Sequence, residues 1–302
     1  MSEEIPIQVQ VSTDDGETWQ TFVKQTPEPT PSPTATPTET PTPTPTPTNG
    51  SEPKAFLATF LSYVNPDQQV ACYAPFLTDH DFVRVRQESN NLTGTEFASL
   101  FKDATMVAVN KIRGIKGADF KTAKQLIALA PRLPKEGFSF VELNIENGSG
   151  FDGSEYNNLM ANYKAAADAA HKAGLKFKAA PMYADLRTNC VEMSKFSDML
   201  HVQTQAVQSQ GTQAFKDRLM AIINKVKSGN PAKNIRYTCQ LSTGQGNING
   251  RTLLQTFQDC TLAVMGTPEL DAITIWFGSA DVAAGKDSII YKYVQWFKSQ
   301  FP

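Results

Sequence analysis

The chain has 302 residues, a hydrophobic fraction of 40% and a formal net charge of −2. This length and composition allow one large folded domain or two ordinary ones. The balanced charge gives no surplus of Lys and Arg for nucleic acid, and no apolar run reaches the roughly 20 residues of a membrane-spanning helix, so we expect neither nucleic acid binding nor membrane insertion.

The first 25 residues contain two β-prone stretches, 7–11 and 18–23, separated by a turn sequence around Gly16. This pattern predicts a β-hairpin. Residues 12–19, Ser-Thr-Asp-Asp-Gly-Glu-Thr-Trp, resemble the Asp-box, a structural hairpin motif of sialidase-like propellers and some β-sandwiches. The resemblance implies a folded turn and no sialidase activity. Because a lone hairpin is marginally stable in water, we expect residues 1–25 to be the end of a larger upstream module.

Residues 26–52 form a Thr/Pro-rich linker, with proline at nearly every second position from Thr26 to Thr48. Such a segment stays extended as polyproline II, and its roughly 3.1 Å per residue gives a long spacer. Thr/Pro tracts are typical of stalks on exported proteins, and a generic disordered linker is the alternative. Residues 1–11 lack the pattern of a signal peptide. We nevertheless expect an extracellular or cell-surface protein, with a monomeric domain tethered to another module.

Residues 53–302 alternate between strand and helix patterns in chain order. Seven stretches predict buried strands: Gln69–Phe76, Thr105–Ile112, Phe138–Ile145, Leu175–Tyr183, Met199–Gln205, Asn234–Leu241 and Asp271–Phe277. Six predict helices: Thr95–Lys102, Ala118–Ala130, Glu155–Ala173, Thr212–Lys227, Thr252–Met265 and Ser288–Phe301. This alternation predicts an α/β fold, a (β/α) TIM-type barrel of seven or eight strands.

An open doubly wound sheet is the second interpretation of the fold. No GxGxxG follows the first strand and no GxxxxGK[ST] occurs, so we expect no nucleotide cofactor. No HExxH or zinc-finger spacing occurs either, so no metal site is expected. The four cysteines, Cys72, Cys190, Cys239 and Cys260, fit either a disulfide or buried free thiols.

The third predicted strand carries the main candidate for chemistry. Its two-residue period places Glu142, Asn144 and Glu146 on one face, which we expect to point into the barrel. Reacting groups of such barrels lie at the carboxyl ends of strands, so Glu146 would reach the mouth and act as a general acid. In the alternative interpretation Glu146 caps a loop. For Glu142 we favour a structural role, paired with a Lys or Arg inside the barrel.

The pattern Glu142-x-Asn144-x-Glu146 resembles the DxDxE strand of chitinase-like family 18 glycosidases. The resemblance implies that Glu146 is the general acid and that Asn144 stands where the family has a carboxylate that assists the substrate's acetamido group. An amide can hydrogen-bond such a group and supplies no negative charge. The last strand resembles the closing strand of barrel glycosidases, which implies that Trp276 stacks against sugar; a core Trp is the alternative.

Other strand ends supply further candidates. Asp185 is the expected second carboxylate, opposite Glu146, and Tyr183 is expected to bind a substrate oxygen. A loop-stabilising role is the alternative for Asp185. The amides of Gln205 and Gln240 suit sugar hydroxyls, although they also suit a polar barrel interior.

The leading hypothesis is therefore an exported glycoside hydrolase-like barrel that acts on a polysaccharide through carboxylate acid/base chemistry. The second is a non-catalytic carbohydrate-binding or surface-display barrel. A cytosolic metabolic barrel enzyme is a third, disfavoured by the Thr/Pro spacer.

Overall fold

The computed structural model divides the chain into two units, residues 1–50 and 51–302. It describes residues 8–12, 19–23, 56–61, 76–78, 81–85, 105–109, 122–147, 153–277, 281 and 284–301. In the first unit, β1 (Gln8–Ser12) and β2 (Trp19–Val23) pair antiparallel, with Ser12 opposite Trp19. The turn of the predicted Asp-box, the Thr/Pro spacer and the predicted helix over 95–102 lie outside the described residues.

The second unit is a closed barrel of eight parallel strands, which confirms the predicted fold class. Each strand pairs with the next along the chain, and the last pairs with the first, Ile273 lying opposite Leu57. The strands are β3 (Phe56–Leu61), β4 (Phe82–Val85), β5 (Thr105–Val109), β6 (Phe138–Leu143), β7 (Lys176–Ala179), β8 (Met199–Val202), β9 (Arg236–Ser242) and β10 (Leu270–Trp276).

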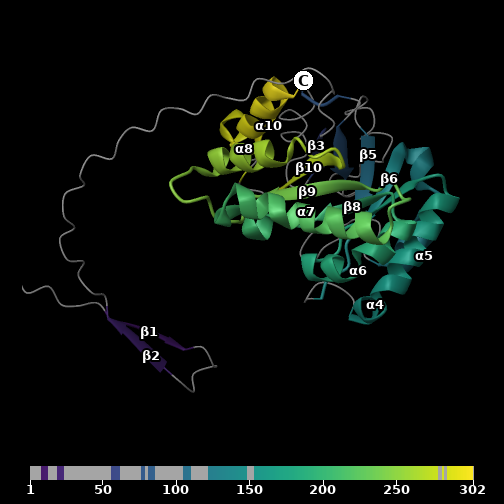
Figure 1. The fold of residues 1–302 in the computed structure, drawn as a ribbon, viewed down its shortest axis with the longest axis horizontal. Helices are drawn as coiled ribbons and strands as arrows, with labels where there is room; N and C mark the ends of the chain where they lie inside the picture. Colours follow the sequence, from purple (N-terminus) through teal and green to yellow (C-terminus); the bar gives the residue numbers. More distant parts are fainter. Residues whose placement is uncertain are drawn as a thin grey trace, which may run out of the picture. The chain divides into compact units, whose positions relative to one another are not determined.

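Helices surround these strands on the outside (Figure 1). They are α3 (Ala123–Leu129), α4 (Gly153–Asn157), α5 (Leu159–Lys172), α6 (Tyr183–Phe196), α7 (Thr212–Gly229), α8 (Leu253–Val264) and α10 (Ile289–Gln300), with short 3₁₀ turns η2 (Leu133–Glu136), η3 (Gln205–Gln210) and η4 (Gly285–Asp287). Thr252 begins α8 with a capping box to Gln255, in which each side chain accepts a hydrogen bond from the other residue's backbone N–H.

Two parts of the predicted element order were wrong. The barrel begins with β3 and β4, neither of which was predicted; the strand expected over 69–76 falls outside the described residues except for Phe76, which lies in a turn. The strand expected over 175–183 ends at Ala179, and α6 begins at Tyr183. The reason is visible in α6, where Leu186, Cys190 and Met193 are buried at the spacing of one helix face.

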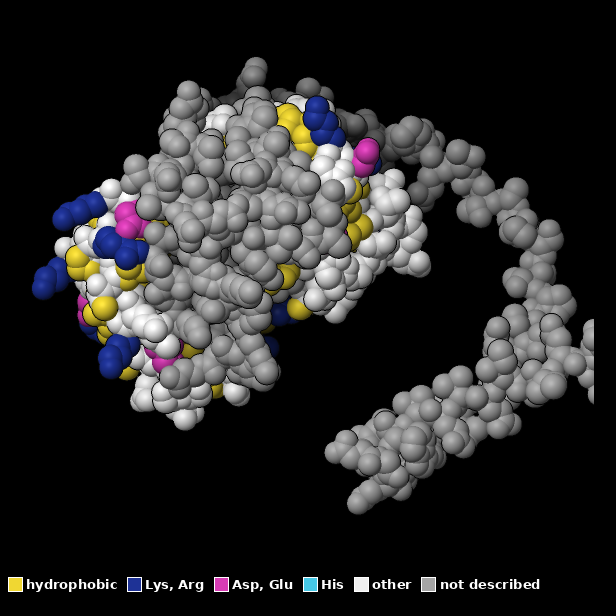
Figure 2. Space-filling view, turned by 180° about the vertical axis from the view of Figure 1, so that it is seen from behind, with side chains coloured by type: hydrophobic (Ala, Val, Ile, Leu, Met, Phe, Trp, Pro, Cys, Tyr) yellow, Lys and Arg dark blue, Asp and Glu magenta, His cyan; other side chains and the backbone are white. Residues whose placement is uncertain are grey.

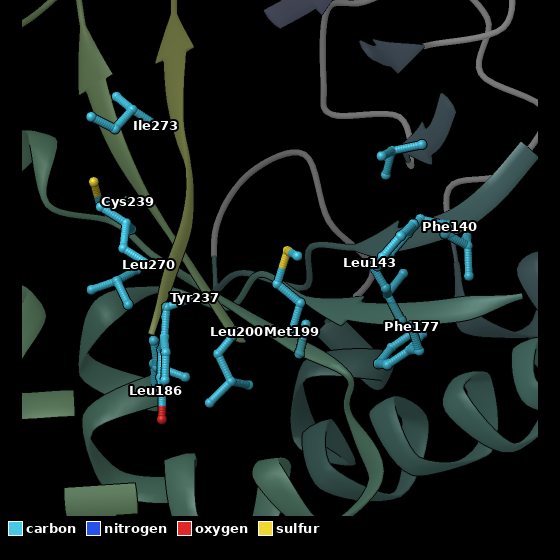
Figure 3. Close-up of a cluster of buried hydrophobic side chains, with 14 of the residues drawn as sticks. Phe140, Leu143, Phe177, Leu186, Met199, Leu200, Tyr237, Cys239, Leu270 and Ile273 are labelled. Atoms are coloured by element: carbon cyan, nitrogen blue, oxygen red, sulfur yellow. The ribbon is translucent and has the colours of Figure 1, made fainter. Parts of the chain in front are cut away.

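The apolar core lies between the strands and the helices. On β6 to β10 most side chains that face the helices are apolar and buried, among them Leu143, Phe177, Leu200, Tyr237, Cys239 and Ile273 (Figure 3). Cys190, Cys239 and Cys260 are buried free thiols, so free thiols rather than a disulfide describe these three. Cys72 lies outside the described residues.

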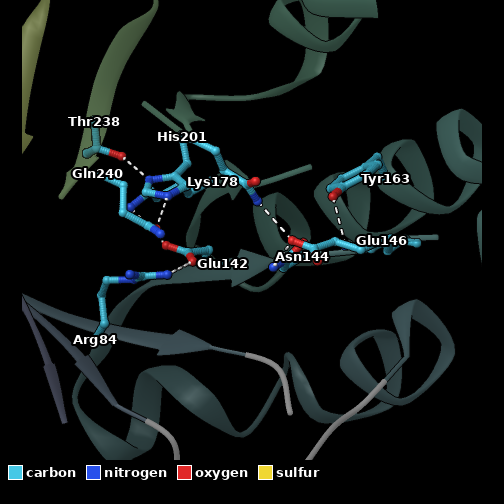
Figure 4. A network of polar contacts seen from close by, with 11 residues as sticks. Arg84, Glu142, Asn144, Glu146, Tyr163, Lys178, His201, Thr238 and Gln240 are labelled. Carbon is cyan, nitrogen blue, oxygen red and sulfur yellow. Dashed lines mark hydrogen bonds and ion pairs between the residues drawn. The ribbon is translucent and has the colours of Figure 1, made fainter. Parts of the chain in front are cut away.

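The inside of the barrel contains a buried polar network. Glu142 on β6 is fully buried and forms ion pairs with Arg84 on β4 and with Lys178 on β7, whose Nζ lies 2.8 Å from Oε2 of Glu142 (Figure 4). Because β5 separates β4 from β6 in the sheet, the contact with Arg84 crosses the barrel interior. The predicted pairing of Glu142 with a Lys or Arg inside the barrel is confirmed.

These ion pairs decide the charge state of the interior. Burial by itself would raise the pKa of Glu142, but the positive charges of Arg84 and Lys178 outweigh it and hold that pKa well below its usual range. Burial lowers the pKa of Lys178, and Glu142 opposes this effect. The carboxylate therefore stays ionised between two cations at neutral pH.

On the face drawn in Figure 2, Lys and Arg side chains stand among acidic and apolar ones. A search of the described residues finds no helix both long and apolar enough to cross a membrane.

Replacing Glu142 tests how far the barrel depends on these ion pairs. In Glu142→Gln, Arg84 and Lys178 would be buried without a counter-charge, so we expect the free energy of unfolding to fall by about 3 to 5 kcal/mol. Urea denaturation of the full chain, followed by the helical circular dichroism of the barrel, measures the change. The matched control is Asp168→Asn, which breaks an ion pair with Lys164 whose side chains are 62% and 59% exposed. It should cost less than about 0.5 kcal/mol, and equal losses in both variants would contradict this account.

Candidate functional site

A pocket of about 330 Å³ opens where the barrel strands end. Its lining residues are Arg84, Asn144, Glu146, Ala180, His201, Gln203, Gln205, Gln240, Ser242, Gly244, Gln245 and Trp276. Ser242 and Trp276 are the last residues of β9 and β10, and Gln203 directly follows β8. The pocket therefore lies at the carboxyl-terminal face of the barrel, where TIM-barrel enzymes carry their active sites.

Glu146 is held at this pocket by two amides. Its Oε1 accepts hydrogen bonds from Nδ2 of Asn144 at 3.0 Å and from Nε2 of Gln203 at 2.8 Å. Its Oε2 makes no hydrogen bond to any residue that the structure describes. The backbone N–H of Ile145 donates to the hydroxyl of Tyr163 on α5 at 3.0 Å, which anchors the end of this strand segment (Figure 4). The carboxyl group is thus fixed through one oxygen.

His201 on β8 links two side chains of β9 beneath the pocket. Its Nδ1 lies 2.8 Å from Oγ1 of Thr238, and its Nε2 lies 2.7 Å from Oε1 of Gln240. Burial, followed by the positive charge of Lys178, lowers the pKa of His201 to about 3, so the imidazole is neutral at neutral pH. The backbone N–H of Gln240 donates to Oγ1 of Thr204 at 2.9 Å, which holds β9 in place beside the turn after β8.

Five of the seven predicted site residues line this pocket: Asn144, Glu146, Gln205, Gln240 and Trp276. Asp185 and Tyr183 are not among the lining residues, because both belong to the first turn of α6. Oδ1 of Asp185 accepts a hydrogen bond from the hydroxyl of Tyr156 at 3.0 Å. The ring of Tyr183 packs under the guanidinium of Arg218, 3.6 Å from its centroid. The structure does not bring these two residues to the pocket beside Glu146.

Other pocket residues were missed as candidates. Arg84 was missed because β4 was not predicted. His201 on β8 and Gln203 directly after it were not chosen as site residues, although the two-residue period of this stretch predicts that both share one face with Gln205. Gln208 donates from Nε2 to the backbone oxygens of Ser242 at 2.9 Å and Gly246 at 3.2 Å, and so shapes the loop that contributes Gly244 and Gln245.

The charges at the pocket are few. Among the lining residues that the structure describes, Glu146 is the single carboxylate. Nowhere in the described part of the chain do three or more His, Cys, Asp or Glu side chains gather as a metal site would require.

Comparisons with known proteins find the fold and no family. No protein-family model and no curated protein matches the chain. A GH18 chitinase from Pseudoalteromonas aurantia is 13% identical, with a TM-score of 0.53, over 82% of this chain and 100% of that one. A family 18 chitinase from Crocus vernus is 11% identical, with a TM-score of 0.54, over 80% and 99%. A glucosidase from Croceicoccus marinus is 11% identical, with a TM-score of 0.52, over 75% of this chain and 59% of that one. These likenesses show the fold alone, a TIM-type barrel.

The neutral, buried His201 predicts acid sensitivity. Its folded-state pKa of about 3 lies below the ordinary value of 6.5, so the unfolded chain binds the extra proton between these values and stability falls as pH falls through that window. We expect His201 alone to contribute a slope of up to about 1.4 kcal/mol per pH unit. In His201→Gln, the decline in the free energy of unfolding between pH 6.5 and 5 should be shallower. Urea denaturation across this range measures both slopes, and identical slopes would contradict the prediction.

Proposed function

We propose that residues 53–302 form a glycoside hydrolase-like barrel that acts on a polysaccharide, with Glu146 as the general acid. The observation that carries this proposal is the placement of Glu146. It lies in a pocket at the carboxyl ends of the strands, with Oε1 held by Asn144 and Gln203 and Oε2 without a partner among the described residues.

The surroundings of Glu146 suit a sugar. A general acid must reach the glycosidic oxygen from a fixed position, and two amide hydrogen bonds fix this carboxyl group. Trp276 offers an aromatic face with a polar edge against which a sugar ring can pack. The amides of Gln205 and Gln245 can both donate to and accept from hydroxyl groups, and the amide of Gln240 can donate to them. The names of similar structures, two chitinases and a glucosidase, support a glycan as the ligand.

A barrel that binds carbohydrate without cleaving it, for example as a surface-display module, is the second candidate. It is favoured by the charges of the pocket, since hydrolysis normally uses two carboxyl groups and the described lining holds one. Asp185, the residue predicted from the sequence as the partner of Glu146, instead binds Tyr156.

The proposed location of the protein is extracellular or at the cell surface. The Thr/Pro spacer supports this part of the proposal, because such segments are typical of stalks that hold a domain away from a surface or a neighbouring module.

Glu146→Gln tests the proposed acid. We expect hydrolysis of any glycan that the full chain cleaves to fall by at least about 100-fold, because the amide cannot donate the proton. Binding should persist. The matched control is Glu192→Gln, at an α6 carboxylate that is 57% exposed, and it should leave hydrolysis unchanged. A reducing-end assay on a panel of polysaccharides, with calorimetry for binding, measures both quantities. Unchanged hydrolysis in Glu146→Gln would refute the assignment, and wild-type binding without turnover would establish the second candidate.

Trp276→Ala tests sugar stacking. Removing the aromatic face should weaken binding of an oligosaccharide about 10-fold, whereas Trp276→Phe should retain most of the affinity because it keeps a flat ring. Isothermal titration calorimetry measures the affinity, and circular dichroism checks that both variants fold. Equal affinity of the wild-type chain and the folded Ala variant would mean that Trp276 is only a packing residue.

A further inference from the structure

Gln240 is bound to the protein through one end of its amide. Its Oε1 lies 2.7 Å from Nε2 of His201. An amide oxygen only accepts hydrogen bonds, so the proton of this contact must be carried by Nε2 of His201. The contact therefore determines which nitrogen of the imidazole is protonated.

The other imidazole nitrogen, Nδ1, forms the second side-chain hydrogen bond of His201. In a neutral ring whose Nε2 is protonated, Nδ1 can only accept, so the Thr238 hydroxyl, 2.8 Å away, donates to it. Hydrogen bonds then run in one direction, from Thr238 through His201 to Gln240. The side-chain oxygen of Gln240 accepts the last of these hydrogen bonds. Its Nε2 has no partner within the described residues. Gln240 consequently presents N–H donors at the pocket.

The side-chain amide of Gln203 is oriented opposite to that of Gln240, with its nitrogen bound and its oxygen unbound within the described residues. Its Nε2 donates to Oε1 of Glu146 at 2.8 Å, and its Oε1 makes no hydrogen bond in the described part of the structure. Gln203 follows β8 directly, and Gln240 lies on the neighbouring strand β9, where His201 is paired in register with Thr238. A donor and an acceptor thus come from adjacent strands to one pocket.

We propose that this opposed pair makes the pocket selective for an uncharged sugar ring, bound through neighbouring hydroxyl groups. One hydroxyl oxygen accepts from Nε2 of Gln240, and the other hydroxyl donates to Oε1 of Gln203. A sugar carboxylate would meet the oxygen of Gln203 and the carboxyl group of Glu146, both of which disfavour an anion. Arg84 also lines the pocket, but its positive charge is already paired with Glu142. His201 is a positioning residue, since it acts on the ligand only through Gln240. This inference rests on the proposed function in that the ligand is a glycan.

The tautomer of His201 tests the hydrogen-bond chain without any ligand. The full chain has three histidines, and comparison with His201→Gln assigns the ring signals of His201 in ¹⁵N-labelled protein. Two-dimensional NMR spectra that correlate ring protons with ring nitrogens distinguish the two tautomers. We expect a neutral ring protonated at Nε2. A ring protonated at Nδ1 would reverse Gln240 and overturn the inference.

Binding tests the selectivity. The probes are cellotetraose, mannotetraose and chitotetraose as uncharged glycans and tetragalacturonate as an acidic one, titrated calorimetrically into the full chain. At least one uncharged probe should bind about 10-fold or more tightly than tetragalacturonate. Gln240→Glu keeps an acceptor for His201 and removes the donor, so it should weaken that probe by about 10- to 100-fold. Gln210→Glu, which adds the same charge on an exposed residue outside the pocket lining, should change affinity less than about 3-fold.

The outcomes separate this inference from the proposed function. Tighter binding of tetragalacturonate, or full affinity in Gln240→Glu, would overturn the selectivity. If Gln240→Glu fails to fold, Thr238→Val replaces it: this near-isosteric change removes the donor to His201 and should weaken the same probe several-fold. If no glycan binds the wild-type chain, the proposed function and the ligand part of the inference fail together, while the NMR result still decides the chain from Thr238 to Gln240.

Discussion

The buried carboxylate of Glu142 is the constraint on which the rest of this barrel depends. A charge that is fully removed from water must be paired, and its two partners come from β4 and β7 on either side of β6. The interior of a TIM barrel is ordinarily packed with branched apolar side chains. Here the main apolar core lies between the strands and the helices, and the described interior holds ions and amides beside a few apolar side chains such as Phe140. The relative positions of these strands are therefore tied to charge pairing as well as to packing.

The same buried charges also influence the side chains that line the pocket. Lys178 pairs with Glu142, and its positive charge, together with burial, keeps His201 neutral. A neutral imidazole can accept at one nitrogen and donate at the other, whereas an imidazolium can only donate. The orientation of the Gln240 amide thus depends on a charge balance one layer deeper in the barrel. Stability and the hydrogen bonds of the pocket share residues in this protein, and a change at Glu142 would reach the pocket through His201.

The features that were predicted correctly depend on the residue pattern within single strands and helices and on their order along the chain. The period of two in β6 identified Glu142 as a paired interior charge, and the alternation of elements predicted the barrel. Arg84 was not found because no strand was predicted over β4. Asp185 was predicted to lie at the end of a strand. The residue pattern after Ala179 does not distinguish the end of β7 from the first turn of α6, where Asp185 lies. The contacts of His201 could not be predicted, since they depend on the register between β8 and β9.

The pocket also shows why likeness of fold is a weak guide to chemistry here. In the resemblance to the family 18 strand, the position of Asn144 would hold a carboxylate. In this chain its amide donates to Glu146, and the amide of Gln203, directly after β8, donates to the same oxygen. A carboxylate at that position could not donate a hydrogen bond unless it were protonated. An amide and a carboxylate there would therefore interact differently with Glu146. In this barrel Glu146 is positioned by neutral donors, the side-chain amides of Asn144 and Gln203. The distribution of donors and acceptors therefore bears more directly on the substrate than the barrel does, because many chemistries share the barrel and the amide orientations belong to this chain.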